Sequence, residues 1–535
     1  MTIYYVDGAS GDDANAGTSS EPWRTLGKAL ASASPGDAVR ARTAVYRESV
    51  GLDKPGTVLE ADEGHKPTID GGYSPALFGA AGYTTKDGKQ IGRNQLPYPS
   101  EANRKRGGWA IASTQGAIVR LSADDTEFRG FVVRNVCGRA VGLRGNRSAL
   151  RDCVIDFTYG GALFLEDGED IEVTGNVITR ASMKAYDPTR DGVEGGGAKV
   201  QTTVIIKKCR RAKVKRNVVL YSKGEGISVD KGSEDSDVSD NVVGCNAHWS
   251  FGTNGSVRPV FENNIAFYSN DPNLYEQLDK DGPADLFVVG NERVITNTGE
   301  NPGLATLQGL VFRGNVLVGD AKRLFLVASG SSGRPVALHD AVIENNTIIG
   351  GASTRTVFTW GTYQKNTHQR TVVRNNIILR HPDSTGDLVK YEGGGGVAWG
   401  HNLSNVPLPN GMRGAGDIVS DGPVLADPFV PILVPAFDMK SPALPDAGAT
   451  FDKAHYRPVA GSPAIGAASD GREIGALPYT KPEEPPDETD PPEPDYGWLI
   501  EELERVKEQV TAAGAAVGQA LLRIDEVIVL FEKKQ

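Results

Sequence analysis

The sequence predicts an all-β parallel β-helix, a solenoid of short strands that begins with a capping helix and is followed by an α-helical coiled coil. A short phrase recurs along the middle of the chain: a hydrophobic residue, two polar residues, usually an Asn, and two mostly hydrophobic residues. Successive Asn slots are often 22 to 24 residues apart, as from Asn217 to Asn241. Beyond residue 496 the apolar spacing changes to alternating steps of three and four. The first period is the signature of a solenoid and the second that of a coiled coil.

The repeated phrase has short β-branched strands and no helical periodicity, so each copy is expected to be one rung, stacked about 4.8 Å from the next. The recurring Asn is expected at a bend, where it tolerates left-handed backbone geometry and can hydrogen-bond to its copy one rung away. We therefore interpret these residues as scaffold rather than as catalytic groups. The nine slots are Phe131, Cys153, Asn176, Asn217, Asn241, Asn264, Asn315, Asn346 and Asn376.

Residues 1–72 are expected to form the entry and cap of the solenoid. A strand is predicted at Ile3–Val6 and a helix over Glu21–Ala33, with Pro22 near its start. One face of this helix would carry Trp23, Leu26, Ala29 and Leu30. A helix placed there would cover the open end of the solenoid, which otherwise exposes an unpaired edge.

The remaining segments follow from changes in composition. Residues 73–117 are weakly patterned and predict a loop or lateral excursion, residues 118–403 the rungs, and the Pro- and Gly-rich residues 404–480 a closing extension. Residues 481–496 form a stiff, self-repelling linker, because six prolines and seven acids fall within residues 481–495.

Residues 497–535 predict a coiled-coil oligomerisation helix. A single helix of this kind has nothing to bury its apolar stripe against, and the β-branched residues at both core positions favour a parallel homotrimer over a two-stranded coil. The a positions are Leu503, Val510, Val517, Ile524 and Phe531, and the d positions are Leu499, Val506, Ala513, Ala520 and Val527.

Composition excludes several other classes. The chain has 535 residues, a net charge of −11 and a pI of about 5.3, which argues against sequence-independent nucleic-acid binding. No apolar run is long enough for membrane insertion, and the N-terminus lacks a basic region followed by an apolar stretch, so we expect synthesis in a cytoplasm without a cleaved signal.

The four cysteines have no metal-ligand spacing and are interpreted as small buried thiols: Cys137, Cys153, Cys209 and Cys245.

Several short motifs resemble the entry and closing segments of pectate-lyase-like right-handed β-helix proteins. At the start these are Tyr4-Tyr-Val-Asp-Gly, Gly17-Thr, Pro22-Trp-Arg-Thr, Pro35-Gly-Asp37, Tyr46-Arg-Glu48 and Ile69-Asp-Gly71, and near the end Gly461-Ser-Pro-Ala-Ile-Gly466 and Ile474-Gly-Ala476. The resemblance covers roughly residues 2–480 and implies a right-handed solenoid. It leaves activity open, because the superfamily contains lyases, hydrolases, epimerases and noncatalytic virion proteins.

Two longer steps between Asn slots indicate where a site would lie. Their excess falls in Ala181–Gln201 and Ser269–Asp285, and both excursions start about five residues after an Asn slot. They are therefore expected to leave the solenoid from the same corner and to wall a cleft over the rungs between them. Acidic residues of the first excursion, Asp191 and Glu194, are candidate substrate-binding groups.

Counting from the Asn slots places chemistry-bearing residues in that cleft. Glu225 and Trp249 share one position on successive rungs and His248 precedes Trp249. Counting backwards predicts one column of Glu166, Lys207, Asp230 and Thr253, and a neighbouring column of Asp167, Lys208, Lys231 and Asn254.

These columns have two interpretations. In a lyase that acts on an acidic sugar, Lys231 or Lys207 would be the base, and Glu166, Asp230 or Glu225 would hold a cation or the substrate. Alternatively, charges of alternating sign form a solvated ion ladder that fixes the register of the strands. His248 and Trp249 suit sugar stacking, or are a simple surface pair. Together the catalytic candidates are Lys231, Lys207, Asp230, Glu225 and His248, and Trp249 is a candidate for substrate binding.

One acidic loop is a weak candidate for Ca²⁺, the single cofactor that the sequence raises. Asp279, Asp281 and Asp285 supply carboxylates, but the loop lacks the complete EF-hand spacing and a distal Glu, so an acidic turn is the alternative.

Two function classes remain. The polygalacturonase signatures Asn-Thr-Asp, Asp-Asp and Gly-His-Gly do not occur on consecutive rungs, since the only Asp-Asp pairs are Asp12-Asp13 and Asp124-Asp125, and the Trp-Ile-Asp-His signature of common pectate lyases is missing too. The lack of a leader and the C-terminal coiled coil favour a bacteriophage tail spike or minor tail protein, a homotrimer that joins other tail or baseplate proteins and contacts host cell-surface polysaccharide, with or without depolymerase activity. The alternative is a bacterial polysaccharide lyase.

Overall fold

The computed structural model describes residues 1–92, 96–109, 116–183, 201–230, 232–269, 271, 274, 285–290, 295–296, 299–300, 305–327, 336–360, 368–391, 395–432, 438–445 and 451–480. The chain divides into two compact units, Met1–Tyr479 and Thr480–Gln535. The predicted linker and coiled coil fall in the second unit and lie outside the described residues.

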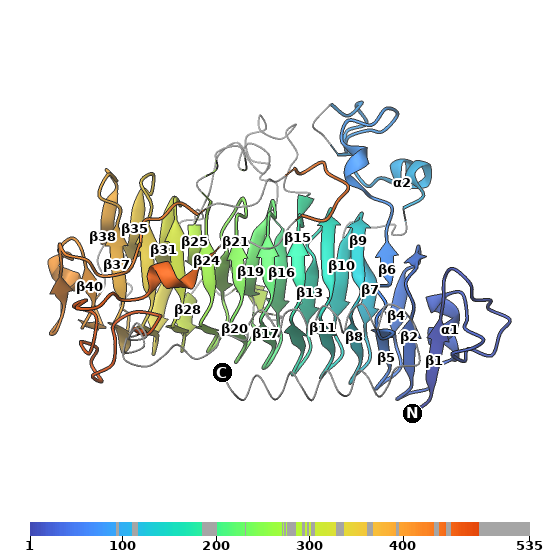
Figure 1. Ribbon diagram of the computed structural model, residues 1–535, viewed down its shortest axis with the longest axis horizontal. Coiled ribbons are helices and arrows are strands. Elements are labelled where there is room, and N and C mark those ends of the chain that lie inside the picture. The colour runs from blue at the N-terminus through green and yellow to red at the C-terminus, as the bar shows by residue number, and fades with distance from the viewer. Residues whose placement is uncertain are drawn as a thin grey trace, which may run out of the picture. The chain divides into compact units, whose positions relative to one another are not determined.

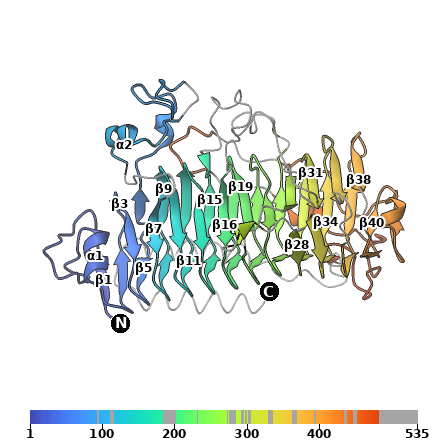
Figure 2. The same ribbon diagram turned by 180° about the vertical axis from the view of Figure 1, so that it is seen from behind.

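Three long parallel sheets form the first unit (Figures 1 and 2). We name them A, B and C in the order in which the chain visits them on each rung. Sheet A has 13 strands: β1 (Ile3–Val6), β2 (Ala38–Ala41), β5 (Val58–Ala61), β8 (Glu127–Arg129), β11 (Ala149–Arg151), β14 (Glu172–Thr174), β17 (Lys213–Lys215), β20 (Asp237–Ser239), β23 (Val260–Glu262), β29 (Val311–Arg313), β33 (Val342–Glu344), β36 (Thr371–Arg374) and β39 (Val397–Gly400).

Sheet B also has 13 strands: β3 (Val45–Tyr46), β6 (Thr68–Asp70), β9 (Val132–Val136), β12 (Val154–Thr158), β15 (Val177–Thr179), β18 (Val218–Leu220), β21 (Val242–Gly244), β24 (Ile265–Phe267), β30 (Val316–Gly319), β34 (Thr347–Gly350), β37 (Ile377–Arg380), β40 (Leu403–Ser404) and β41 (Ile418–Val419). Sheet C has 11: β4 (Val50–Leu52), β7 (Ala117–Leu121), β10 (Arg139–Leu143), β13 (Leu163–Glu166), β16 (Thr202–Lys207), β19 (Glu225–Asp230), β22 (Phe251–Asn254), β25 (Asp285–Gly290), β31 (Arg323–Val327), β35 (Thr356–Trp360) and β38 (Asp387–Tyr391).

Two small sheets accompany them. Antiparallel β26 (Ile295–Thr296) and β27 (Gly299–Glu300) form one, and parallel β28 (Ala305–Gln308) and β32 (Val336–His339) form the other. The repeat therefore produces the predicted all-β solenoid.

Apolar residues stack in register through the interior. Phe251, Phe287, Phe325 and Phe358 pair on successive strands of sheet C, and the ring centroids of Phe325 and Phe358 lie 4.7 Å apart. All four side chains are buried. Because each rung buries its apolar residues against the next, the core is continuous along the solenoid.

The predicted asparagine ladder is confirmed. Asn217 donates its backbone and side-chain N–H to Asn241 Oδ1, each over 3.0 Å, and Asn241 does the same to Asn264. The ladder runs from Asn176 to Asn402, one rung further than the repeated phrase indicated. The expected left-handed backbone lies one residue earlier, as at Asp240 with φ of 58°, because the residue before the Asn turns the corner.

The N-terminal helix is shorter than predicted. Helix α1 spans Leu26–Ser32, and Thr25 caps it by accepting a hydrogen bond from the backbone N–H of Lys28. Asp13 accepts the Thr25 hydroxyl over 2.8 Å, so the cap is held by a second loop and Pro22 lies outside the helix. Leu26, Ala29 and Leu30 are buried, as expected. The role of the helix as a cover for the first rung stays a prediction.

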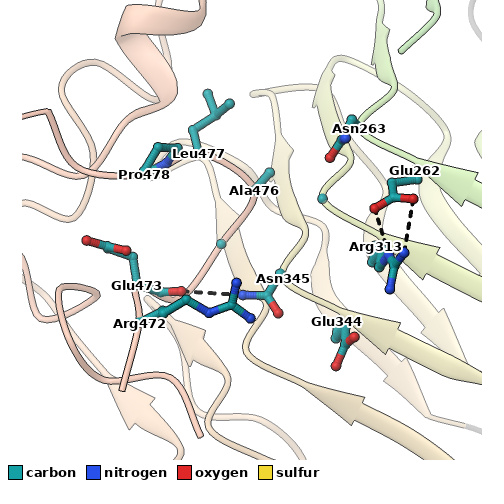
Figure 3. A pocket seen from close by; sticks show the side chains of 12 residues that line it. Glu262, Asn263, Arg313, Glu344, Asn345, Arg472, Glu473, Ala476, Leu477 and Pro478 are labelled. Carbon is teal, nitrogen blue, oxygen red and sulfur yellow. Dashed lines mark hydrogen bonds and ion pairs between the residues drawn. The ribbon is translucent and has the colours of Figure 1, made fainter. Parts of the chain in front are cut away.

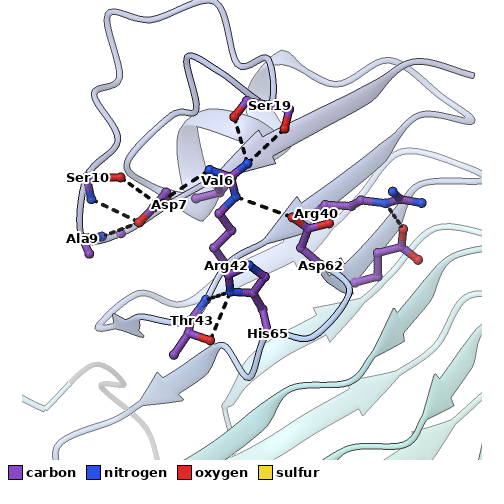
Figure 4. Close-up of polar contacts among 12 residues, drawn as sticks. Val6, Asp7, Ala9, Ser10, Ser19, Arg40, Arg42, Thr43, Asp62 and His65 are labelled. Carbon is purple, nitrogen blue, oxygen red and sulfur yellow. Dashed lines mark hydrogen bonds and ion pairs between the residues drawn. The ribbon is translucent and has the colours of Figure 1, made fainter. Parts of the chain in front are cut away.

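Arg42 ties the loops of the entry segment together (Figure 4). Its guanidinium donates to the carbonyl and hydroxyl oxygens of Ser19 over 2.8 and 3.0 Å, and forms ion pairs with Asp7 and Asp62. The entry motif that resembles other β-helix proteins is therefore stabilised by polar contacts between segments distant in sequence.

The described residues 73–92 and 96–109 belong to an excursion that stands off the sheets in Figure 1. It holds the short helices η1 (Pro75–Leu77) and α2 (Glu101–Gly107), which the weak sequence pattern did not predict. The ring of Tyr73 meets those of Trp109 and Tyr159 edge-on at centroid distances of 4.8 and 5.5 Å. This aromatic cluster anchors the excursion to the solenoid.

The closing segment contains β41 and the short helices η3 (Asn410–Met412) and η4 (Lys453–Tyr456), and it returns along sheet B. Arg180 anchors it far from its start. The fully buried guanidinium pairs with Asp156 and donates to the carbonyl oxygens of Met439, Ser441 and Ala443. In Figure 1 the orange stretch of the segment accordingly passes beside β15.

All four cysteines are free and buried, which confirms their interpretation as small core thiols. Burial raises the pKa of the Cys153 thiol to about 12, so this thiol is inert at neutral pH. Among the described residues, no helix is long and apolar enough to cross a membrane.

Candidate functional site

The two long excursions leave the solenoid from the same corner, as predicted. One connects β15 of sheet B with β16 of sheet C, and the other connects β24 of sheet B with β25 of sheet C. Most residues of both excursions lie outside the described residues, including Asp191 and Glu194. The rungs between the two excursions present the outer face of β16, β19, β22 and β25, which we call the sheet C face.

Side-chain alternation determines which residues line the sheet C face. Ile227 and Val229 are fully buried in the core, so Ser228 and Asp230 point to the opposite side. At the start of β19 the alternation shifts by one. A Cβ on Gly226 would lie 2.6 Å from the Val243 side chain, so Gly226 faces the core and Glu225 faces outward.

The charged column exists, with one correction. Glu166 pairs with Lys207, Lys207 with Asp230, and Asp230 with Asn254 rather than with Thr253. Thr253 is opposite Val229, and its side chain is fully buried. The backward count failed because the turn from Asp230 to Asp237 is one residue longer than the turn from Asn254 to Val260.

Lys207 is engaged by a carboxylate. Its Nζ lies 2.7 Å from Glu166 Oε1, and Arg144 pairs with the other Glu166 oxygen. Burial acts to raise the pKa of the Glu166 carboxyl, but the hydrogen bond and charge of Lys207 together with the charge of Arg144 hold it below its ordinary value. This part of the column is the ion ladder of the second interpretation.

Glu225 and Asp230 have hydroxyl partners on the same face. The Thr202 hydroxyl donates to Glu225, and the Ser228 hydroxyl donates to Asp230 Oδ1 over 2.6 Å. Each of the two acidic residues is less than a tenth exposed. Two carboxylates on one strand, held by small hydroxyl residues, can orient sugar hydroxyls or exchange protons with them.

His248 and Trp249 lie in the turn before β22 and are half-buried. The indole of Trp249 lies over Gly252, where a Cβ would come within 2.8 Å of its Nε1. The glycine therefore lets the indole lie against the sheet. Within the described part of the chain, the indole N–H has no hydrogen-bond partner. The backbone carbonyl of His248 accepts the hydroxyl of Tyr268, which fixes this turn.

The remaining predicted residues divide into two groups. Lys231, Asp279 and Asp281 lie outside the described residues. Asp285 begins β25 and is 5% exposed, and its two carboxylate oxygens accept hydrogen bonds from the Arg323 guanidinium over 2.8 and 2.7 Å. Among the described residues, no three His, Cys, Asp or Glu side chains are grouped as metal ligands. The guanidinium of Arg323 thus occupies the carboxylate that the Ca²⁺ hypothesis required.

A second feature of sheet C was missed by sequence reasoning. A hollow of about 210 Å³ opens on the outer side of β7, β10 and β13, lined by Arg120, Arg139, Arg144 and Phe164 above Ala117 and Gly142. Arg139 stands eight residues after the Phe131 slot, as Glu225 and Trp249 do after theirs. Extending that count to the early rungs would have found it.

A larger groove lies elsewhere, between the turns after β23, β29 and β33 and the closing segment (Figure 3). It encloses about 480 Å³. Glu262 is occupied by Arg313 over 2.8 and 3.1 Å, and Asn345 donates to the carbonyl oxygen of Glu473 over 3.4 Å. The contact of Asn345 with Glu473 joins the closing segment to the solenoid, so we interpret the groove as a seam between them.

Comparison with known proteins agrees with this architecture. Residues 115–279 match the family model described as "Right handed beta helix region". No curated protein sequence matches the chain at a significant level.

The solved structures that match the chain include two lyases and a tailspike protein. The pectate lyase Pel9A is 14% identical, over 90% of this chain and 97% of that one, with a TM-score of 0.46. A polysaccharide lyase of the PL6 family from Pseudopedobacter saltans is 14% identical, over 72% and 96%, with a TM-score of 0.42. The Dettilon tailspike protein is 9% identical, over 78% and 68%, with a TM-score of 0.43.

The family match over residues 115–279 and the in-register stacking of the three parallel sheets together assign the fold of Met1–Tyr479 as a right-handed parallel β-helix.

Proposed function

We propose that this protein is a receptor-binding tail spike or minor tail protein of a bacteriophage, which binds host cell-surface polysaccharide on the sheet C face. The observation that carries the proposal is that Glu225 and Asp230 on β19 and Trp249 in the turn before β22 lie on one face, between two excursions that leave from one corner.

The face suits an extended polymer. Strands of a parallel sheet repeat about every 4.8 Å, so a chain of sugars lying along the solenoid meets successive rungs. The indole of Trp249 offers an apolar surface to a sugar ring, and Glu225 and Asp230 offer carboxylates to its hydroxyl groups. The core beneath is continuous and keeps these groups in place.

The sequence after residue 480 supports the virion assignment. A stiff linker followed by about five heptads is a device for joining several β-helices and attaching them to other tail or baseplate proteins. Light scattering tests the homotrimer: the full chain is expected at about three times 56.8 kDa. A full-length monomer or dimer refutes it. A trimer that persists in a chain ending at Tyr479 shows that the coil is not what holds it together.

A polysaccharide lyase is the second candidate, since Glu225 and Asp230 are carboxylates at low exposure on the proposed binding face. Binding is favoured over lysis because Lys207, one of the two candidate bases, is already paired with Glu166. As a depolymerase the protein would use Lys231 or Lys207 as the base and the acidic residues as partners.

The test uses purified protein with host capsule or cell-wall polysaccharide. Co-sedimentation measures binding, while ultraviolet absorbance of unsaturated products and reducing ends measure cleavage by elimination or hydrolysis. Binding without either product supports the receptor-binding role. Unsaturated product that disappears in Lys231→Ala or Lys207→Ala, with binding retained, supports the lyase, whereas absence of binding to any host polysaccharide refutes both.

A further inference from the structure

The hollow on β7, β10 and β13 has an unusual lining. Three arginines, Arg120, Arg139 and Arg144, face a space of about 210 Å³, and no acidic residue lines it. Its floor is low because Ala117 and Gly142 stand where neighbouring rungs have larger side chains. The hollow is thus positive in a chain whose net charge is −11.

Arg139 is the centre of this arrangement. Its guanidinium carbon lies 3.7 Å from the centroid of the Phe164 ring, and Phe164 is itself 9% exposed. Among the described residues, no carboxylate forms an ion pair with Arg139. Burial lowers the pKa of its guanidinium, and the charge of Glu166 offsets this in part. A partly buried cation stacked on a ring keeps N–H groups that can donate to an anionic ligand.

The neighbouring charges do not supply that anion. Glu166 is already shared by Arg144 and Lys207. Arg120 donates to the Ser49 hydroxyl over 2.9 Å and has no acidic partner in the described part of the chain. The positive charge of the hollow therefore exceeds what nearby carboxylates neutralise, and it is concentrated where a small group can enter.

We propose that this hollow binds a saccharide unit carrying a carboxylate or sulfate group, so that the recognised glycan is anionic. The planar guanidinium of Arg139 forms paired hydrogen bonds to the oxygens of such a group, while Arg120 and Arg144 add charge from either side. Phe164 supplies an apolar wall for the sugar ring. The proposal rests on the proposed function and specifies its ligand, at a position several rungs from Trp249 on the same sheet.

The experiment compares three polymers with one backbone: dextran, carboxymethyl dextran and dextran sulfate. Binding to the full-length protein is measured by biolayer interferometry at 150 mM salt, together with thermal stabilisation. Two variants alter the hollow: Arg139→Gln removes the central charge, and Ala117→Leu fills the space without changing charge. Arg370→Gln is the matched control, because it removes one arginine charge from an exposed turn ion pair with Asp340, outside the hollow.

The wild-type protein is expected to bind at least one anionic dextran and not dextran itself, and the two anionic polymers distinguish carboxylate from sulfate recognition. Arg139→Gln and Ala117→Leu should each weaken binding about tenfold or more, with Arg370→Gln close to wild type. Within the described residues Arg139 forms no ion pair, so Arg139→Gln loses only the contact with the Phe164 ring and should stay close to the wild-type melting temperature, which separates loss of binding from unfolding.

Unchanged binding by both hollow variants, or equal binding of neutral dextran, overturns the inference. Tighter binding of a short single-stranded DNA than of either anionic dextran, with the same sensitivity to Arg139→Gln, overturns the saccharide assignment. If the protein adsorbs to host polysaccharide through Trp249 but binds neither anionic dextran, this inference fails and the proposed function stands. If no glycan of any kind binds, both fail.

Discussion

The outer faces of sheets A and C both carry charged side chains on successive rungs, but they use them differently. On sheet A, acids and bases pair from one strand to the next, as in Arg151–Glu172, Lys215–Asp237, Glu262–Arg313 and Glu344–Arg374. On sheet C, Glu166 pairs with Lys207 and Asp285 with Arg323 in the same way, but Arg139 stacks on a ring and forms no ion pair with a described residue. Charges that satisfy one another fix the register of strands, whereas a cation stacked on a ring keeps N–H groups for a ligand.

A third set of charges runs along the turns between sheets C and A. Arginine and aspartate alternate there on successive rungs, each in left-handed backbone geometry, and pair in twos. The pairs are Asp125–Arg147, Asp170–Arg211, Asp235–Arg258 and Asp340–Arg370. These turns resemble sheet A, because their acidic and basic side chains are paired from one rung to the next. Sheet C differs from both in holding Arg139 against a ring, outside the ion pairs of the described residues.

The largest expected difference between the two faces is between two tryptophans. Trp249→Ala should reduce adsorption to host polysaccharide roughly tenfold or more without lowering the melting temperature much, because the indole lies on the proposed binding face. Trp399, in sheet A, packs against Trp360 at a ring centroid distance of 5.2 Å. Trp399→Ala should therefore cost about 2 to 4 kcal/mol of unfolding free energy and leave adsorption unchanged.

Adsorption assays and chemical unfolding on both variants measure this contrast. If Trp249→Ala adsorbs like the wild type, the sheet C face is not the binding site. If Trp399→Ala loses adsorption while still folded, the distinction between the two faces is wrong.

A smaller effect is expected from acid. Burial acts to raise the pKa of the Glu60 carboxyl in sheet A, but hydrogen bonds and charges from Arg40 and Arg129 hold it below its ordinary value of 4.5. Its ionised form therefore stabilises the fold fully above that value, and the contribution is lost as the pH falls through the lower folded pKa. Melting temperatures between pH 6 and pH 3 should fall, and the decline should be shallower in Glu60→Gln.

A decline as steep in Glu60→Gln as in the wild type would show that other carboxyls dominate. Arginine stays charged throughout this range, so binding of a sulfated dextran to the hollow should persist wherever the protein is folded. Acid should therefore weaken the stabilisation that sheet A gains from Glu60, while the arginines of sheet C keep their charge.

The smallest expected effect concerns Asp235, whose φ is 54°. Asp235→Ala removes the exposed ion pair with Arg258 and keeps the strained geometry, so it should destabilise the protein by up to about 1 kcal/mol. Asp235→Gly removes the same pair but adopts the left-handed geometry without strain, and should be close to neutral. Urea unfolding of the two variants decides this, and a glycine variant less stable than the alanine variant contradicts the account.

The sequence predicts the solenoid well because one physical requirement recurs on every rung. A buried Asn at each bend must find partners for its amide, and the next Asn supplies them, so spacing alone locates the ladder. The same spacing carries no information about φ, which is why the left-handed residue was placed at the Asn rather than one position before it. Counting backwards from one Asn slot also assumes that all turns have the same length. Because they do not, the count placed Thr253 opposite Asp230, where the structure has Asn254.

The helix and the hollow show two further limits. The helix was predicted over Glu21–Ala33 but begins at Leu26. Thr25 caps it and is held by Asp13 of another loop, a contact that hydrophobic periodicity does not reveal. The hollow arises from Ala117 and Arg120 on β7, Arg139 and Gly142 on β10, and Arg144 directly after β10, and these residues form no motif along the chain. Sites assembled from residues one rung apart are found by register rather than by local pattern.

The clamp at Arg180 has a consequence for the order in which the molecule is completed. Its partners at Met439, Ser441 and Ala443 are synthesised roughly 260 residues later. The rungs can add to one another as the chain emerges, through contacts close in sequence, but this contact closes a very long loop and should be among the last to form. Until the closing segment docks, Arg180 pairs with Asp156 but lacks its three carbonyl acceptors from that segment. A nascent or truncated chain is therefore recognisable by an unprotected sheet B near β15, a vulnerability to proteases that the finished protein lacks.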